Sequence, residues 1–314
     1  MTKDFDVIVY GTVCLDRIWR VESLAAPGSY ESILEARTML GGEAANTAVA
    51  LSRWGVRVAL VGTATGDDED GATLRLLLNT DASDVNIDGL DQIPGVQTPY
   101  CVCIATPDGH RTMYGSGFTD MQCPELDPAF ARRARLFTME PNAFQAGIAA
   151  ARVAAAAGLD IVAMDYTSSP EVNRASTIAV TSHERLNDST NLQSAADHAE
   201  RVRETDGCTT IVTCGHNGCF VADRDQTGQS AYHIPAYVVE DVIDSTGAGD
   251  IFRAGLIFGQ LKGWNLSESA RFASAAAALN CSAMGGWGGV QTVPEITAFQ
   301  KRTPTRPTKQ ANNR

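Results

Sequence analysis

The chain has 314 residues, of which 44% are hydrophobic and 20% charged, with 28 glycines. This composition is that of a folded globular protein and excludes a disordered chain, a collagen and a coiled coil. The net charge of -12 offers no general basic surface for DNA or RNA. No stretch approaches the roughly 18 apolar residues of a membrane-spanning helix. We therefore expect a cytoplasmic protein with no nucleic-acid or membrane partner.

Short apolar runs alternate with helix-period segments along most of the chain. The expected strands are residues 5–10, 56–61, 136–139, 159–164, 177–180 and 209–213. The expected helices are residues 44–54, 143–157, 192–203, 251–261 and 267–284. The alternation predicts an α/β fold: a doubly wound, mostly parallel sheet with helices on both faces. We predict a single domain over residues 1–301 and a disordered tail over residues 302–314.

Two segments, residues 15–38 and 98–118, break this alternation. The first has a turn at Pro27-Gly28 and the second a turn at residues 107–109, as exposed hairpins do. We expect both to form one small β-sheet, a lid over the crevice at the carboxyl ends of the parallel strands. A surface hairpin without a lid function is the alternative.

The lid is also expected to make a homodimer. Its predicted outer face carries the apolar residues Ile18, Trp19, Val102 and Ile104. Two lids packed face to face across a two-fold axis would bury these side chains.

One group of cysteines could hold zinc, since cysteine and histidine are its usual ligands. The group consists of Cys208, Cys214, His216 and Cys219. Its spacing is not that of a zinc knuckle, and residues 208–214 have the pattern of a buried strand, in which cysteine is a small apolar residue. We expect reduced cysteines and no metal there.

A glycine-rich turn precedes the predicted helix at residues 251–261. Gly247 and Gly249 let the backbone fold tightly and expose its N–H groups, and the positive end of the helix points to the same place. Asp250 follows in the first helical turn, where an aspartate either caps the helix or acts as a base. An anion cradle beside a base is what phosphoryl transfer to a hydroxyl requires.

Two motifs resemble the signatures of the ribokinase-like (PfkB) carbohydrate kinase family. Residues 244–252 are similar to its carboxyl-terminal signature, and residues 41–46 with 51–55 to its amino-terminal one. The resemblance covers most of residues 5–300 and implies a ribokinase-like fold. It also implies that Asp250 is the catalytic base, that the backbone of Gly247, Ala248 and Gly249 is the anion hole, and that ATP with Mg²⁺ is the phosphoryl donor.

The same resemblance assigns the ligand sites. The implied sugar-binding residues are Asp16, Gly41, Gly42, Asn46 and Glu140. The implied nucleotide-binding residues are Thr213, Gly215, Gly218 and Thr246. A monovalent cation such as K⁺ is implied near Asp244 and Thr246, together with the carbonyl groups of residues 283–286.

The chain departs from the family pattern at its metal and sugar sites. The family has an Asn-x-x-Glu motif that organises magnesium, but here Ser182 replaces the asparagine and Arg185 stands at the glutamate position. Glu184, one residue away, is left as a metal ligand acting through water. Glu43 stands where ribokinases have a lysine, which argues against ribose as the substrate.

The expected function is an ATP-dependent kinase of a neutral ketose or pentose. A nucleoside is an alternative substrate, stacked on Tyr100, Tyr114 and Phe118. A sugar acid or sugar phosphate is another, with Arg17, Arg37 and Arg111 as candidate counter-charges.

The sequence argues against three other functions. A dinucleotide-dependent oxidoreductase would need a GxGxxG turn after the first strand, and a Walker A kinase would need GxxxxGK[ST]; neither occurs. A non-catalytic sugar-binding protein could keep the same fold, although the intact turn before Asp250 argues against it.

Overall fold

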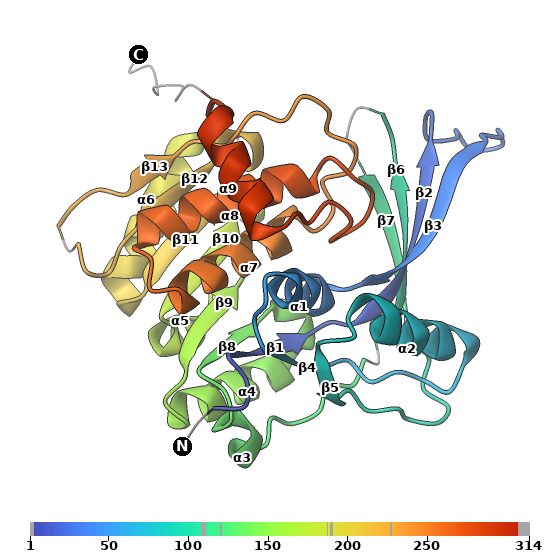
Figure 1. The fold of residues 1–314 in the computed structure, drawn as a ribbon, viewed down its shortest axis with the longest axis horizontal. Coiled ribbons are helices and arrows are strands. Elements are labelled where there is room, and N and C mark those ends of the chain that lie inside the picture. Colours follow the sequence, from blue (N-terminus) through green and yellow to red (C-terminus); the bar gives the residue numbers. More distant parts are fainter. Residues whose placement is uncertain are drawn as a thin grey trace.

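A large β-sheet runs through the middle of the molecule (Figure 1). The computed structural model describes residues 3–107, 111–119, 121–186, 188, 191–226 and 228–306. Within them the sheet has nine strands in the order β13-β12-β11-β10-β9-β8-β1-β4-β5. These are β1 Val7–Gly11, β4 Val58–Gly62, β5 Asn86–Gly89, β8 Leu136–Met139, β9 Asp160–Met164, β10 Ile178–Ser182, β11 Thr209–Thr213, β12 Cys219–Ala222 and β13 Tyr232–Ile234. All pairs are parallel except those of β12 with β11 and β13.

Helices cover both faces of this sheet. Along β1, Val7 and Val9 pack into one core and Ile8 and Tyr10 into another, because alternate residues of a strand point to opposite faces. The first core is closed by α1 Glu43–Arg53, α7 Ala248–Leu261, α8 Leu266–Asn280 and α9 Val293–Arg302, with α2 Glu69–Asp81 beside α1. The second is closed by α3 Pro128–Ala131, α4 Phe144–Ala156 and α5 Pro170–Ala175, while α6 Leu192–Asp206 covers β11 and β12. The predicted doubly wound fold is confirmed.

The two segments that broke the alternation lie in one separate sheet. Its strands are β2 Cys14–Val21, β3 Ile33–Gly41, β6 Tyr100–Ala105 and β7 Arg111–Ser116, in the order β3-β2-β6-β7. Here β2 and β6 pair in parallel although they come from distant parts of the chain. This sheet stands beside the main domain (Figure 1). Of the predicted turn at residues 107–109, only Pro107 lies within the described residues.

The predicted outer face of the small sheet was wrong at one residue. Ile18 is fully buried and packs with Cys103 and Met284, so it faces the domain. Trp19 and Ile104, which pair with each other, lie on the opposite, half-buried face. Neighbouring residues of a strand point to opposite faces, so Ile18 and Trp19 could not share one.

The end of the described chain is attached to the domain. Helix α9 ends at Arg302, Thr305 pairs with Tyr237, and the N–H group of Arg306 donates to the carbonyl oxygen of Ala236. The remainder of the predicted tail, residues 307–314, lies outside the described residues. Among the described helices, none has the length and apolar character to cross a membrane.

Candidate active site

The site lies where the order of the parallel strands reverses, at β1 and β8, which is where doubly wound sheets bind ligands. Glu140, fully buried, follows β8 and joins the two strand ends. Its Oε1 accepts hydrogen bonds from the N–H group and Oγ1 of Thr12 at 2.5 and 2.6 Å, and its Oε2 accepts from the N–H group of Asn142 at 2.6 Å. Both oxygens of this predicted sugar ligand are therefore bound by the protein itself.

The glycine turn before α7 packs closely against the backbone of Gly286. Gly247 has φ = 73°, and a Cβ atom there would lie 2.0 Å from the carbonyl oxygen of Gly286, so only glycine fits. Helix α7 begins at Ala248, and no side chain of the described residues caps it. The N–H groups of a helix's first turn have no partner inside the helix. The N–H group of Ala248 donates to the carbonyl oxygen of Ser245 at 3.3 Å. An anion is the ligand that the positive end of a helix favours.

Neighbouring loops hold this turn in place. The Oδ1 of Asp244 accepts hydrogen bonds from the N–H group and Oγ1 of Thr246 at 2.8 and 2.6 Å, and its Oδ2 accepts from the N–H group of Gly285 at 2.8 Å. The Nδ2 of Asn280 donates to the carbonyl oxygens of Thr246 and Gly286 at 3.3 and 3.1 Å. The hydroxyl of Thr246, a predicted nucleotide ligand, is therefore used inside the loop.

Asp250 is buried in the first turn of α7. Its Oδ2 accepts a hydrogen bond from the Nδ2 of Asn46 in α1 at 2.9 Å, and its Oδ1 lies 3.4 Å from the Nη2 of Arg253. Burial raises the pKa of Asp250 to about 6, while Arg253 and the hydrogen bond from Asn46 act to lower it. Both oxygens of the carboxylate are therefore held by the protein, and Arg253 and Asn46 favour its ionised form.

One polar atom of the Asn46 side chain lacks a hydrogen bond within the part of the chain that the structure describes. Its Oδ1 is buried and has no hydrogen-bond partner among the described residues. A buried acceptor without a donor costs free energy, on the order of 1–3 kcal/mol. A hydroxyl group of a ligand beside Asp250 would remove this cost.

The remaining sugar-binding residues of the prediction cluster around Asp16. This aspartate of β2 is buried, and burial raises its pKa to about 7. A Cβ atom on Gly41 would lie 2.1 Å from the Asp16 carboxyl group, and one on Gly42 would lie 2.3 Å from the carbonyl oxygen of Thr12. Both glycines are therefore required by close packing at the root of the small sheet.

Glu43 adds a further acidic group beside them. Burial, reinforced by the charges of Glu140 and Asp250, raises the pKa of Glu43 to about 8. Its Oε1 accepts a hydrogen bond from the Nδ2 of Asn142 at 3.1 Å. At neutral pH this side chain is mainly the neutral acid.

The predicted metal region contains an ion pair. Asp165 follows β9 with φ = 59°, and its carboxylate lies 2.8 Å from the Nε of Arg185. The N–H group of Glu184, which is exposed, donates to Ser182 Oγ at 3.3 Å. The described residues include no group of three or more acidic, histidine or cysteine side chains that could hold a metal.

The predicted nucleotide residues lie farther along the same edge of the sheet. Thr213 ends β11, and its Oγ1 donates to the carbonyl oxygen of Thr181 at 3.3 Å. Gly215 is exposed with φ = 52°. Gly218 is buried, and a Cβ atom there would lie 2.1 Å from the carbonyl oxygen of Ile234, so the following hairpin requires this glycine.

Comparison with known proteins identifies the family. A model of the pfkB family carbohydrate kinases matches residues 4–292. The chain belongs to this family. A nucleoside kinase from Methanothermobacter thermautotrophicus is 27% identical and covers 88% of this chain and 89% of its own. An uncharacterized sugar kinase from Dictyostelium discoideum is 26% identical over 93% of this chain and 96% of its own.

Solved structures confirm the ribokinase-like fold of this PfkB kinase. Ribokinase from Arabidopsis thaliana, solved with ribose and ATP, superposes with a TM-score of 0.78 at 20% identity, covering 96% of this chain and 99% of its own. Nucleoside kinase from Burkholderia thailandensis, solved with inosine, gives 0.72 at 21% identity, covering 94% and 96%. The chain is therefore a phosphotransferase, a kinase of the sugar and nucleoside class.

Of the three candidate counter-charges in this PfkB kinase, one reaches the site. Arg17 is bound to Asp70 at 2.5 Å and stacks on Tyr100 on the outer face of the small sheet. Arg37 is paired with Glu35. Arg111 donates from Nη1 to the Oγ of Ser245, in the turn before α7, at 2.7 Å.

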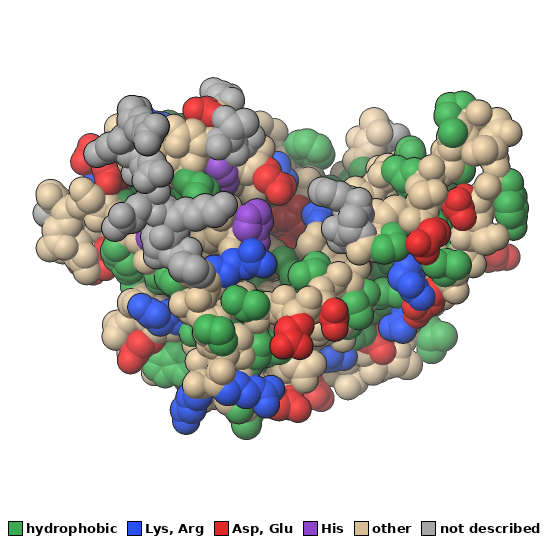
Figure 2. Space-filling model, turned by 90° about the horizontal axis from the view of Figure 1, so that it is seen from above, with side chains coloured by type: hydrophobic (Ala, Val, Ile, Leu, Met, Phe, Trp, Pro, Cys, Tyr) green, Lys and Arg blue, Asp and Glu red, His purple; other side chains and the backbone are tan. Residues whose placement is uncertain are grey.

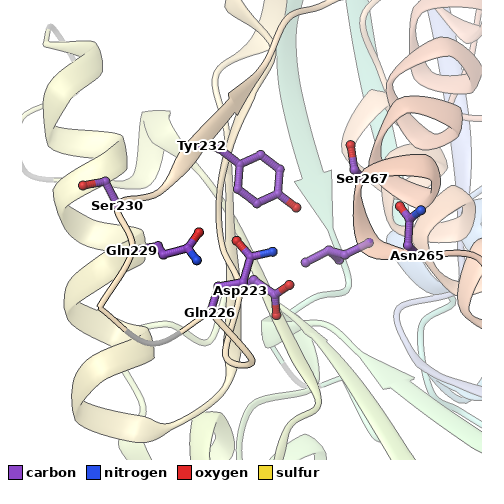
Figure 3. A pocket seen from close by; sticks show the side chains of 8 residues that line it. Asp223, Gln226, Gln229, Ser230, Tyr232, Asn265 and Ser267 are labelled. Atoms are coloured by element: carbon purple, nitrogen blue, oxygen red, sulfur yellow. The ribbon is translucent and has the colours of Figure 1, made fainter.

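One surface cavity of the kinase lies away from this site. It has a volume of about 370 Å³ and is lined by Asp223, Gln226, Gln229, Ser230, Tyr232, Asn265, Leu266 and Ser267 (Figure 3). Because β12 is antiparallel to β11, Asp223 after β12 lies at the opposite edge of the sheet from Thr213. On the face shown in Figure 2, the acidic and basic side chains of the described residues are interspersed.

Proposed function

We propose that this kinase transfers the γ-phosphoryl group of ATP to a hydroxyl of a small neutral sugar, a ketose or a pentose. The observation that carries the proposal is the pair Asp250 and Asn46: an ionised carboxylate beside an uncapped helix turn, and a buried amide oxygen that lacks a donor. The reacting hydroxyl of the substrate would donate its proton to Asp250, and a neighbouring hydroxyl of the same sugar would donate to the Oδ1 of Asn46.

The reaction then follows from these groups. The hydroxyl proton passes to the Asp250 carboxylate as the substrate oxygen forms a bond to the γ-phosphorus and the bond from that phosphorus to the β-phosphate oxygen breaks, releasing ADP. Backbone N–H groups of Gly247, Ala248 and Gly249 are proposed to stabilise the negative charge on the transferred group.

Sugar recognition is assigned to the root of the small sheet. Asp16 is proposed to accept two substrate hydroxyls, and Gly41 and Gly42 to let the sugar approach the backbone. Glu140 is proposed to act from beneath the sugar by fixing Thr12 and Asn142. The carboxylates of Asp16 and Asp250 at the proposed sugar site disfavour an anionic substrate, which is why we favour a neutral sugar.

A sugar acid or sugar phosphate is the second candidate, and the position of Arg111 favours it. This arginine is the counter-charge that contacts the turn before α7. The nucleoside alternative has weaker support. Tyr114 lies across from Val102 on the outer face, where Tyr100 is already stacked by Arg17, so these two rings do not face the site. The third ring, Phe118, packs against Gly115, which pairs with Cys101 on the face that carries Asp16.

Mg²⁺ and K⁺, the two ions expected for this family, differ in how well the residues of the site could hold them. Mg²⁺ fits as an ion held by nucleotide phosphates and water, with Glu184 contacting it through water, because the described residues contain no direct metal cage. It would neutralise charge on the phosphates. K⁺ fits less well, because the carbonyl oxygens of Thr246 and Gly286 already accept hydrogen bonds from Asn280. No step is assigned to K⁺.

The test is a coupled ADP-release screen over neutral ketoses and pentoses, sugar acids, sugar phosphates and nucleosides. We expect a neutral sugar to give the highest kcat/KM. The variant Arg111→Gln distinguishes a neutral sugar from an anionic one as the substrate. Arg37→Gln is the matched control, because Arg37 pairs with Glu35 and does not contact the turn before α7. Selective loss of sugar-acid or sugar-phosphate turnover in Arg111→Gln would establish the second candidate. ADP release that no compound stimulates would show a non-catalytic binding protein.

A further inference from the structure

A buried cation lies among the acidic groups of the site. Arg253 is fully buried, one helical turn after Asp250 in α7, and its Nη2 lies 3.4 Å from the Asp250 Oδ1. Sequence reasoning did not single it out. The signal was present, because residues three apart on a helix share one face.

The guanidinium is fixed by hydrogen bonds to separate elements. Its Nη1 donates to the carbonyl oxygen of Met139, at the end of β8, at 3.1 Å. Its Nη2 donates to the carbonyl oxygen of Glu43 at 2.7 Å and to the Oγ1 of Thr47 at 2.8 Å, both in α1. Its Nε also donates to Thr47 Oγ1, at 3.1 Å. The positive charge therefore stays beside Asp250.

The other titratable groups that face Asp250 are acidic. They are Glu43 of α1, Glu140 after β8, Asp165 after β9 and Asp16 of β2. Each of these carboxyl groups disfavours a negative charge on Asp250 when it is ionised, and burial does the same. A base in this setting needs a fixed positive charge to remain ionised.

We propose that Arg253 is a positioning residue for the reaction, whose guanidinium keeps the Asp250 carboxylate ionised and oriented without contacting the substrate. The inference rests on the proposed function, in which Asp250 is the base. Arg253 holds Oδ1 while Asn46 holds Oδ2, so the carboxylate cannot rotate away from the substrate hydroxyl.

The test is the pH dependence of kcat/KM in wild type, Arg253→Gln, Arg253→Lys and Thr47→Val. Loss of an opposite charge at this distance raises a carboxyl pKa by about 1–3 units. We therefore expect the acid limb of Arg253→Gln to move up by at least about one pH unit, so that activity lost near neutrality returns at higher pH. Arg253→Lys keeps the charge. Thr47→Val keeps Arg253 but removes a hydroxyl that hydrogen-bonds the guanidinium and the carbonyl oxygens of Glu43 and Asp250. Both variants should keep the wild-type limb, because neither removes the positive charge.

A parallel fall of Arg253→Gln activity at every pH would overturn the proposal and leave Arg253 a structural residue. If circular dichroism shows this variant to be unfolded, the pH profile of Arg253→Lys tests the proposal instead. A limb within about half a pH unit of wild type supports the charge role, and activity at every pH as low as that of Asp250→Asn overturns it.

A double variant separates this proposal from the proposed function. If Arg253 acts through Asp250, adding Arg253→Gln to Asp250→Asn should reduce kcat by less than about threefold beyond Asp250→Asn alone, since residues that act as a unit are not additive. An additive loss would mean that Arg253 acts elsewhere. Wild-type turnover by Asp250→Asn alone would instead remove Asp250 as the base, and the proposed function would fail on that point.

Discussion

Arg185 binds Asp165 at the carboxyl edge of the sheet, with 2.8 Å between the guanidinium Nε and the carboxylate. A cation thus occupies the sequence position at which the family pattern has a magnesium-organising glutamate. The same carboxylate accepts a hydrogen bond from the Oγ1 of Thr181 at 2.8 Å, so the ion pair is tied to the end of β10.

Restoring the family pattern should change how magnesium is used. In the variant Ser182→Asn with Arg185→Glu, a second carboxylate next to Asp165 should attract the metal and lower the Mg²⁺ concentration for half-maximal rate. Sugar preference should not change. Arg185→Gln alone is the control, because it removes the ion pair without adding a ligand. An unchanged magnesium dependence with an altered sugar profile would place this loop in the sugar pocket.

Asp250→Asn tests the proposed base. We expect a folded protein that binds ATP normally but loses roughly 10²–10⁴ in kcat, the usual contribution of a positioned base. Steady-state kinetics with the best substrate of the screen measures this loss, and circular dichroism checks the fold. Turnover close to that of the wild type would exclude Asp250 from proton transfer.

Asp16→Ala tests sugar recognition. The kcat/KM for the sugar should fall by about 10² or more, whereas the Kd for ATP, measured by calorimetry, should change little. Asp16→Asn is a milder control that keeps the shape and part of the hydrogen bonding. Equal weakening of both ligands would show that Asp16 supports the structure of the site and does not bind sugar.

Glu43→Gln should stabilise the protein in a pH-dependent way. Burial raises the pKa of Glu43 from 4.5 to about 8, so folding takes up a proton between these pH values and the wild type loses stability as pH rises through them. Glutamine carries no such penalty and keeps an oxygen for Asn142. The gain in Tm should be near zero around pH 4 and largest above about pH 8, as measured by scanning calorimetry. A gain independent of pH would contradict the raised pKa.

The homodimer remains a proposal that rests on the outer face of the small sheet, where Trp19, Val102 and Ile104 are half-buried and Tyr114 is exposed. Light scattering at micromolar concentration should give twice the mass of the chain. Trp19→Asp should give a monomer, because it places a charge in the buried face, while Tyr30→Ser, at an exposed residue near the tip, serves as the control. A monomeric wild type would exclude the dimer.

The sequence predicted best those parts of the fold that are buried on both sides. The bounds of β8 and β11 agree with the prediction, because every residue of these strands except Thr213 is buried and all are apolar residues or β-branched threonines. Strand β5, Asn86–Gly89, was missed because it is a polar edge strand. Helix α2 was also missed, although Asp68 caps it and Leu74 and Leu78 lie on its buried face.

Within the candidate site, the sequence could name residues but not their partners. Asp250 came from the glycine turn and Asn46 from the family resemblance, and the structure brings them into contact. The three-residue spacing of Asp250 and Arg253 was a local signal for that pair. The contact of Glu140 with Thr12 joins distant parts of the chain, and no local pattern reports it.

Strands β2 and β3 of the small sheet connect directly to β1 and α1 of the main domain. Strand β2 leaves β1 through residues 12–13 and carries Asp16, while β3 returns through Gly42 directly into α1, which carries Asn46. Asp16 therefore lies on the small sheet, whereas Asp250 lies on α7 of the main domain. In the proposed function, a tilt of the small sheet would change the separation of the two carboxylates, so that sugar binding and presentation of the hydroxyl to the base would be coupled.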